Sequence, residues 1–119
     1  MPHSSQDVHK KLLGFQGEIL VCEYLKKQGF KILKKNYRTP FGEADLLAQD
    51  GDEIVFVEVK TRESLRFGSP REAVGKVKQQ RYYQIAKFYW KQTGEEPNAR
   101  FDVAEVYPNG EIDYIKNAF

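Results

Sequence analysis

Two apolar segments joined by a short polar turn constrain the fold of this chain more than any other feature. Residues 43–49 and 53–61 flank Asp50-Gly51-Asp52, a pattern typical of an antiparallel β-hairpin. The second segment is apolar at both alternating sets of positions, as expected of a strand that is covered on both sides. The sequence therefore predicts a hairpin whose second strand lies in the centre of a sheet.

The flanking sequence predicts a helix on either side of this hairpin. Ser4-x-x-Asp7 can cap a helix that begins near Ser5, and Gly29 is a typical stop. Ser69-Pro70-Arg71-Glu72 has the features of a second helix start, and this helix would end near Thr93. Its apolar stripe would consist of Val74, Val77, Arg81, Ile85 and Phe88.

Three further strands complete the predicted sheet. They are expected over residues 30–37, 100–107 and 111–114, and the lysines of the first are typical of an edge strand. The second helix would be a crossover, so the strand after it could lie parallel to the strand before it. The 119 residues have the size of one domain. We therefore expect a single α/β domain over residues 1–119, with a mixed five-stranded sheet flanked by helices.

Charge is distributed unevenly along the chain, although the net charge is only +2. Between Lys26 and Arg38 there are six basic residues and no acid, and the stretch from Lys60 to Arg81 has seven basic residues against two acids. Basic stretches on either side of acidic residues fit a polyanion such as a nucleic acid. The alternative is that these lysines and arginines coat exposed faces.

Composition also excludes several classes of protein. Cys22 is the single cysteine, so an intramolecular disulfide is excluded and a zinc cluster is not offered. No apolar segment has the length of a membrane span, and the N-terminus lacks the apolar core of a signal peptide. The expectation is a soluble cytoplasmic protein without a membrane partner.

The hairpin places acidic residues next to each other. A turn centred on Gly51-Asp52 sets Asp45 opposite Glu58 and Glu43 opposite Lys60. Because side chains alternate along a strand, these four residues would share one face. The other face would pair Leu46 with Val57 and Ala44 with Val59.

Two facing carboxylates suggest a metal site. Their β-carbons would be roughly 5 Å apart, and like charges so close raise one pKa unless a cation lies between them. Mg²⁺ or Mn²⁺ suits Asp45, Glu58 and the backbone carbonyl of Val59 better than zinc does. Lys60 would position a water and stabilise a charged phosphorus centre. The alternative is that Glu43–Lys60 and a neighbouring pair are cross-strand salt bridges. That alternative leaves the facing carboxylates of Asp45 and Glu58 without a positive charge to balance them.

These residues resemble the PD-(D/E)xK nuclease superfamily, which shares the restriction-endonuclease core. The chain as a whole is similar to the YraN-type family of small bacterial proteins. The resemblance covers nearly the whole chain, and its combination of spaced acids with Glu-x-Lys is specific. It is carried by Gly14-x-x-Gly17-Glu18, Asn36-Tyr37-Arg38, Gly42-Glu43-Ala44-Asp45-Leu46-Leu47, Phe56-Val57-Glu58-Val59-Lys60-Thr61-Arg62, Phe67-Gly68, Lys76 and Phe101-Asp102-Val103.

The resemblance implies further site residues. Archaeal Holliday-junction resolvases have a similar core and place a glutamate of the first helix at the metal, which corresponds to Glu18 here; an exposed glutamate at a helix edge is the alternative. Gln79 and Tyr83 match the Gln-x-x-x-Tyr element of RecB-like nucleases, although surface and packing roles are the simpler explanation. Ala44 departs from the proline that is frequent in the superfamily, which should change packing more than chemistry.

The implied function is that of a Mg²⁺- or Mn²⁺-dependent endonuclease acting on DNA, with branched or damaged structures as candidate substrates and a homodimer as a possible form. Asp45, Glu58 and Lys60 would be catalytic, and Arg38, Arg62 and Lys76 would contact the nucleic acid. Two alternatives remain open at this point. One is a catalytically inactive nucleic-acid-binding module, and the other is an adaptor that docks through its aromatic second helix.

Overall fold

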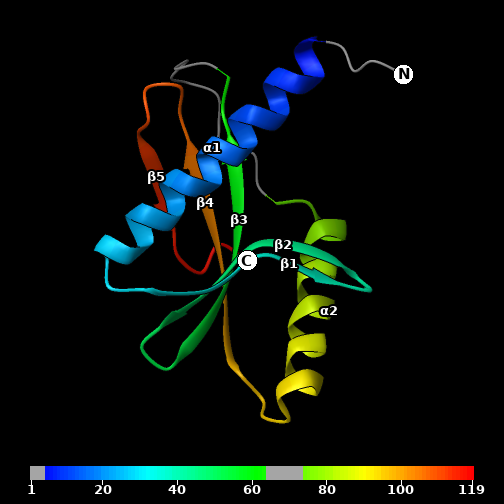
Figure 1. The fold of residues 1–119 in the computed structure, drawn as a ribbon. Coiled ribbons are helices and arrows are strands. Elements are labelled where there is room, and N and C mark those ends of the chain that lie inside the picture. Colours follow the sequence, from blue (N-terminus) through cyan, green and yellow to red (C-terminus); the bar gives the residue numbers. More distant parts are fainter. Residues whose placement is uncertain (1–4, 64–73) are drawn as a thin grey trace.

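A computed structural model of the protein describes residues 5–63 and 74–119, with side chains from residue 16 onward. The chain forms two helices and five strands (Figure 1), in an order that agrees with the α/β prediction. Strand β3 has the predicted bounds, and the other strands differ from prediction by one or two residues at their ends. The elements are α1 (Ser5–Lys27), β1 (Lys31–Thr39), β2 (Gly42–Asp50), β3 (Glu53–Thr61), α2 (Lys76–Thr93), β4 (Asn98–Val106) and β5 (Ile112–Ile115).

The strands form one sheet in the order β1-β2-β3-β4-β5. Neighbouring strands are antiparallel except β3 and β4, which are parallel and are connected through α2. The mixed five-stranded sheet, the edge position of β1 and the crossover are therefore confirmed. No helix of the described part of the chain is both long and apolar enough to cross a membrane.

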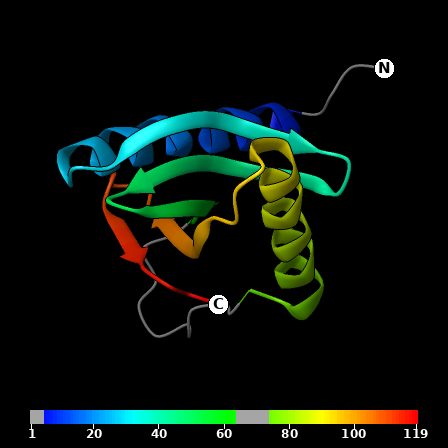
Figure 2. The same ribbon diagram turned by 90° about the horizontal axis from the view of Figure 1, so that it is seen from below.

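The two helices cover different sides of the twisted sheet (Figures 1 and 2). Helix α1 packs Val21 and Leu25 against a core that includes Val57. Helix α2 packs Tyr82 and Ile85 against a second core around the fully buried Phe56. Complete burial of a side chain of this size stabilises the fold by about 1.5–3 kcal/mol. Strand β3 contributes to both cores, as its continuous apolar sequence predicts.

Helix α1 approaches β3 closely at Gly17. A β-carbon at Gly17 would lie 2.6 Å from Cγ2 of Thr61 and 3.7 Å from Cγ1 of Val59. A glycine inside a helix costs about 1 kcal/mol relative to alanine, and the close approach gives the physical reason for it. The same contact fixes Val59 and Thr61 on the α1 side of the sheet.

Helix α2 begins later than predicted. Its first residue is Lys76, and Gly75 precedes it in an extended conformation with φ −64° and ψ 157°. The predicted start at 69–72 lies outside the described residues, as does the pair Phe67-Gly68. Since Val74 and Gly75 are not helical, a continuous helix from Ser69 is wrong.

The predicted stripe on α2 is also wrong in part. Val77 is 76% exposed, whereas Tyr82, Ile85 and Ala86 are buried. The buried face is set by Tyr82, whose hydroxyl finds a hydrogen-bond partner inside the protein. Tyrosine is intermediate among residue types in how often it is buried, so a stripe chosen for its most apolar residues leaves Tyr82 out. The predicted apolar face is therefore rotated around the helix axis relative to the face that is buried.

The hairpin register is confirmed near the turn and wrong farther from it. The pairs from Asp50–Glu53 to Leu46–Val57 are as predicted, but the ladder ends there, before Asp45 and Glu58. On the other side of β2, the pairing with β1 passes over Asn36, which has a positive φ of 52°. Asparagine adopts this conformation more readily than most residues.

Side chains change direction along β2 in the segment that lies opposite Asn36. Ala44 belongs to the core under α2, whereas Leu46 belongs to the core under α1. The prediction that Ala44 and Leu46 share a face is therefore wrong, as is the common face assigned to Glu43 and Leu47, because Glu43 lies near Glu18 of α1 whereas Leu47 belongs to the core under α2. Strict alternation holds only for a regular strand, and β2 is not regular opposite Asn36.

Candidate metal and catalytic site

Asp45 lies where β2 and β3 separate. Its Oδ2 accepts a hydrogen bond of 2.8 Å from the backbone N–H of Val59, although the regular ladder has ended two residues earlier on β3. The Asp45 side chain thus connects β2 to β3 beyond the last backbone pair of the ladder. This bond holds the Asp45 carboxyl against β3 beside Glu58.

Glu58 is buried, with 7% of its surface exposed, and α2 holds both of its oxygens. The ammonium of Lys78 donates to Oε1 at 2.5 Å, and the hydroxyl of Tyr82 donates to Oε2 at 2.5 Å. Tyr82 is itself only 1% exposed. Buried charges require partners of this kind, and these two contacts fix the orientation of the carboxylate.

The two carboxyl groups affect each other strongly. Burial raises the pKa of Asp45 from 3.8 to about 7, and the negative charge of Glu58 is the second cause. The Val59 N–H opposes this rise, and Lys78 does so more weakly. The predicted conflict between Asp45 and Glu58 therefore exists in the fold, although the two residues are not a pair in the ladder.

Glu18 reaches the same region from α1. Burial raises the pKa of its carboxyl, and the negative charge of Glu43 adds to this effect. Asn36 connects the two glutamates: with its amide nitrogen turned toward them, that nitrogen lies 2.8 Å from Glu43 Oε1 and 3.2 Å from Glu18 Oε1. Glu18 thus lies near enough to Asp45 for its negative charge to contribute to the raised pKa of Asp45. The immediate neighbours of Glu18, however, are Asn36 and Glu43.

Lys60 follows Glu58 by two residues on β3. The parallel ladder between β3 and β4 is unbroken from Glu53–Asn98 to Thr61–Val106, so side chains alternate regularly here. Because Val59 and Thr61 face Gly17 of α1, Lys60 lies on the opposite side of the strand together with Glu58. Glu-x-Lys therefore presents its acid and its base to the same side, as the sequence predicts.

The donor set fits a hard divalent cation in part. The buried carboxyl group of Glu58 and the partly buried one of Asp45 repel each other, which favours an ion that prefers oxygen ligands. Among the described side chains, those of residues 16–63 and 74–119, however, no three Asp, Glu, His or Cys residues are grouped closely enough to hold an ion by themselves. Asp45 and Glu58 are thus the pair available for a metal, and Glu18 is held slightly apart by Asn36 and Glu43.

The three residues predicted to contact nucleic acid lie in different surroundings. The side chain of Arg38 is 83% exposed and has Glu43 3.6 Å away, while Lys76 is exposed at the start of α2. Arg62 forms an ion pair of 3.2 Å with Glu105, a residue that is 1% exposed. Arg62 is therefore held by the protein itself, whereas Arg38 and Lys76 extend into solvent.

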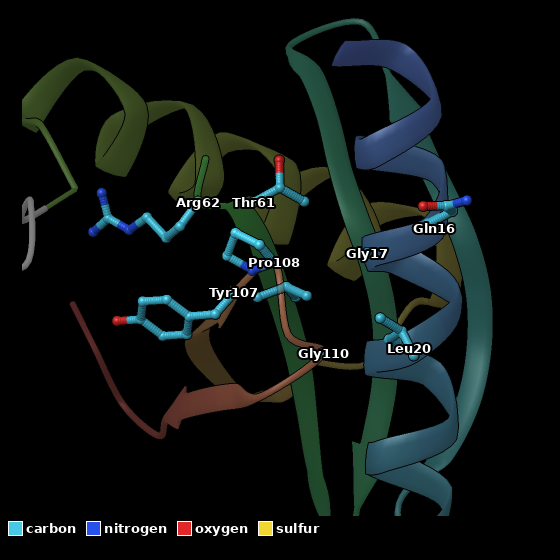
Figure 3. Close-up of a pocket in the computed structure, with 9 residues that line it drawn as sticks. Gln16, Gly17, Leu20, Thr61, Arg62, Tyr107, Pro108 and Gly110 are labelled. Atoms are coloured by element: carbon cyan, nitrogen blue, oxygen red, sulfur yellow. The ribbon is translucent and has the colours of Figure 1, made fainter. Parts of the chain in front are cut away.

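A small hollow lies between α1 and the connection from β4 to β5 (Figure 3). Its volume of about 90 Å³ has room for a few water molecules. The side chains of Arg62 and Tyr107 extend away from α1 in this view. The hollow is too small for a nucleotide and is separate from the Asp45–Glu58 pair. It is lined by Gln16, Gly17, Leu20, Thr61, Arg62, Val106, Tyr107, Pro108 and Gly110.

Sequence reasoning missed the two residues of α2 that hold Glu58. The suggested pair Gln79–Tyr83 lies elsewhere: the Gln79 amide donates to the Val74 carbonyl, and the Tyr83 ring packs on Phe101 with centroids 5.1 Å apart. Lys78 and Tyr82 have the same spacing one position earlier. The available signal was this i,i+4 spacing, which places both side chains on one face of a helix.

Comparisons with known proteins agree with this architecture. The chain matches Uncharacterised protein family UPF0102 over residues 17–106. A UPF0102 protein of Caldicellulosiruptor saccharolyticus is 45% identical over 118 residues, which cover 94% of this chain and 100% of that protein. A UPF0102 protein of Thermodesulfovibrio yellowstonii is 46% identical over 107 residues, which cover 90% of this chain and 95% of that protein.

Among solved structures, a Holliday junction resolvase of Archaeoglobus fulgidus is similar to this fold. Its TM-score is 0.50 at 20% sequence identity, and the match covers 83% of this chain and 72% of the resolvase. A likeness at this level of identity bears on the fold alone. The chain thus has the restriction-endonuclease-like fold, and it belongs to the UPF0102 family.

Proposed function

We propose that this protein is a Mg²⁺-dependent endonuclease that hydrolyses phosphodiester bonds in DNA. The observation that carries the proposal is the pair formed by the partly buried Asp45 and the buried Glu58, in which like charge helps to raise the pKa of Asp45 to about 7. Such a perturbed pair in a folded protein is typical of a functional site. Lys60 on the same side of β3 as Glu58 supplies the positive charge that phosphoryl chemistry uses.

Each residue has a distinct role in this proposal. Asp45 and Glu58 would hold Mg²⁺, with the Val59 carbonyl as a further oxygen and Glu18 as the candidate from α1. Bound Mg²⁺ would lower the pKa of a water and neutralise charge on the phosphate. Lys60 would orient the attacking water and stabilise the charge that develops on the phosphoryl oxygens. The Val59 N–H and the Tyr82 hydroxyl keep the two carboxylates in place.

Branched or damaged DNA is the substrate class that we favour. The fold is shared with a Holliday junction resolvase, and Arg38 and Lys76 are exposed cations that could contact phosphates. Cleavage of two strands at a junction needs two sites, which a homodimer would supply. The alternative, a catalytically inactive DNA-binding module, is separated from the nuclease by the experiment below.

The test is cleavage of a labelled DNA panel with Mg²⁺ or Mn²⁺, comprising a single strand, a duplex, a flap and a four-way junction. We expect wild type to cut a branched member and Lys60→Ala to lose this activity while it keeps its DNA affinity. Glu58→Gln should behave like Lys60→Ala. Lys87→Ala is the matched control, because Lys87 is an exposed lysine on the outer part of α2. DNA binding without cleavage by folded wild type would identify the inactive module instead.

A further inference from the structure

Lys78 contacts Glu58, but the site predicted from the sequence assigns no role to this lysine. Its ammonium lies 2.5 Å from Glu58 Oε1, and its side chain is 40% exposed although it contacts a carboxylate that is 10% exposed. The lysine therefore reaches inward from the surface, and its flexible stem allows the ammonium to leave without a change in the backbone.

The location of Lys78 on α2 is unfavourable by itself. It belongs to the first turn of the helix, where the backbone dipole favours acidic residues and disfavours cations. This turn contains no acid. The contact with Glu58 compensates for this placement, since an ion pair with a buried carboxylate offsets part of the repulsion from the helix terminus.

The groups around Glu58 indicate what the contact between Lys78 and Glu58 does. Asp45 is held beside Glu58 by the Val59 N–H, and Tyr82 satisfies the second Glu58 oxygen without adding charge. The ammonium of Lys78 is in direct contact with Glu58, and its charge also acts on Asp45. It thus supplies the positive charge that a metal ion would supply between the same two groups.

We propose that Lys78 is the resident cation of the metal-free site and that a divalent ion displaces its ammonium from Glu58. The inference rests on the metal site of the proposed function. It makes Lys78 a positioning residue that holds the Glu58 carboxylate in place until the ion arrives. It also implies competition, because a metal must remove Lys78 from Glu58 before it can bind fully.

Mn²⁺ binding to the metal-free protein tests this proposal without reference to catalysis. Titration followed by electron paramagnetic resonance gives the Kd for wild type, Lys78→Met and Lys78→Gln. We expect both variants to bind Mn²⁺ tighter by on the order of tenfold, because a competing like charge has been removed. Lys78→Gln keeps a hydrogen-bond donor, so it reports on charge even where Lys78→Met perturbs the fold. Lys87→Met should leave the Kd unchanged.

Thermal unfolding provides the second readout. In EDTA the two Lys78 variants should melt below wild type, and saturating Mn²⁺ should raise their melting temperatures by more than it raises that of wild type. Unchanged or weaker Mn²⁺ binding by both variants would overturn the displacement, while DNA cleavage by wild type would leave the nuclease standing. Absence of Mn²⁺ binding in wild type and in both variants would overturn the metal site and the displacement together.

Discussion

At the scale of single residues, the contacts in the site hold two carboxyl groups next to each other although their like charges repel. Asp45 is held by one backbone N–H at 2.8 Å, and Glu58 by Lys78 and Tyr82 at 2.5 Å each. Each contact is favourable alone, but together they hold the partly buried carboxyl group of Asp45 next to the buried one of Glu58. Functional sites often retain such local conflict at the expense of stability.

The pKa of Asp45 predicts a specific dependence of stability on pH. Its value of about 7 in the fold, against 3.8 ordinarily, means that the folded protein binds the additional proton between these pH values. In EDTA the free energy of unfolding should therefore fall as pH rises from about 4 to 7, with a slope of at most about 1.4 kcal/mol per pH unit from this group. Asp45→Asn should remove that component and be more stable than wild type at pH 8.

Urea denaturation at pH 5, 6, 7 and 8 measures this effect. Asp52→Asn is the control, since Asp52 is exposed in the turn between β2 and β3. Wild type and Asp52→Asn should share one pH profile, and Asp45→Asn should have a flatter one. Parallel profiles for all three proteins would show that Asp45 does not retain its proton in the fold.

Tyr82 and Tyr83 offer a matched pair for the role of a single hydroxyl. Tyr82→Phe removes the donor to Glu58 Oε2 and leaves a buried carboxylate oxygen unsatisfied, which should destabilise the protein by roughly 1.5–3 kcal/mol. Tyr83 packs its ring on Phe101 and Phe119, so Tyr83→Phe should change stability by less than about 0.5 kcal/mol. Chemical denaturation in EDTA compares the two variants, and equal losses would contradict the assigned role of the Tyr82 hydroxyl.

Residue types could be predicted from sequence, but their precise neighbours could not. Asp45, Glu58 and Lys60 follow from acids and a base on apolar strands. The neighbours of Glu18 depend on Asn36, whose positive φ of 52° carries no clear signal in a strand rich in lysine. Lys78 and Tyr82 come from a helix distant in sequence, so their contact with Glu58 depends on how the crossover packs.

At the scale of elements, regular segments follow local rules and irregular ones do not. Strand β3 has the predicted bounds because its apolar run is bounded by polar residues on both sides. The early part of β2 departs from prediction, since Ala44 lies in the core under α2 whereas Leu46 lies in the core under α1. The start of α2 was misplaced because a capping motif indicates a possible helix start and does not require the helix to be continuous beyond it.

The approach of α1 to β3 depends on Gly17, and a substitution there tests it. Gly17→Ala would place a methyl group 2.6 Å from Cγ2 of Thr61, so we expect destabilisation of about 1–3 kcal/mol. Thr61→Ala removes the opposing group, and the double variant should recover part of the loss. Urea denaturation of the single and double variants measures this coupling.

Gly75→Ala serves as the control for Gly17→Ala. A β-carbon at Gly75 meets nothing within 4 Å, and its φ of −64° suits any residue. The free energy of unfolding of Gly75→Ala should therefore stay close to that of wild type. Additive losses in the Gly17 and Thr61 double variant would indicate that the helix does not depend on this contact.

At the scale of the whole molecule, a second charged cluster lies apart from the candidate site. Arg100 and Asp102 on β4 are both buried and are joined by bonds of 2.9–3.2 Å. Arg100 also reaches Asp50 and Glu53 at the hairpin turn, each at 2.9 Å. The cluster thus ties β4 to the start of β3, whereas Asp45 and Glu58 lie where β2 and β3 separate.

Asp102 also anchors the segment that follows β5. Its carboxylate accepts bonds from the Tyr114 hydroxyl at 2.6 Å and from the Asn117 N–H at 2.9 Å. Asp102→Asn weakens this network and removes the buried carboxylate that faces two nitrogens of Arg100. Since loss of one member of a buried ion pair typically costs 3–5 kcal/mol, we expect destabilisation of about that size. Glu111→Gln, an exposed acid before β5, should change stability by less than about 0.5 kcal/mol.

Metal affinity distinguishes the two clusters. Because Asp102 is not among the causes of the raised pKa of Asp45, folded Asp102→Asn should bind Mn²⁺ with the Kd of wild type although its free energy of unfolding is lower. Asp45→Asn should show the reverse, with weaker Mn²⁺ binding and higher stability in EDTA at pH 8. Denaturation and Mn²⁺ titration of both variants measure this contrast directly. A matching loss of affinity in Asp102→Asn would mean that the two ends of β3 respond as one unit, in which case the stability of the fold and the affinity of the site could not be changed separately.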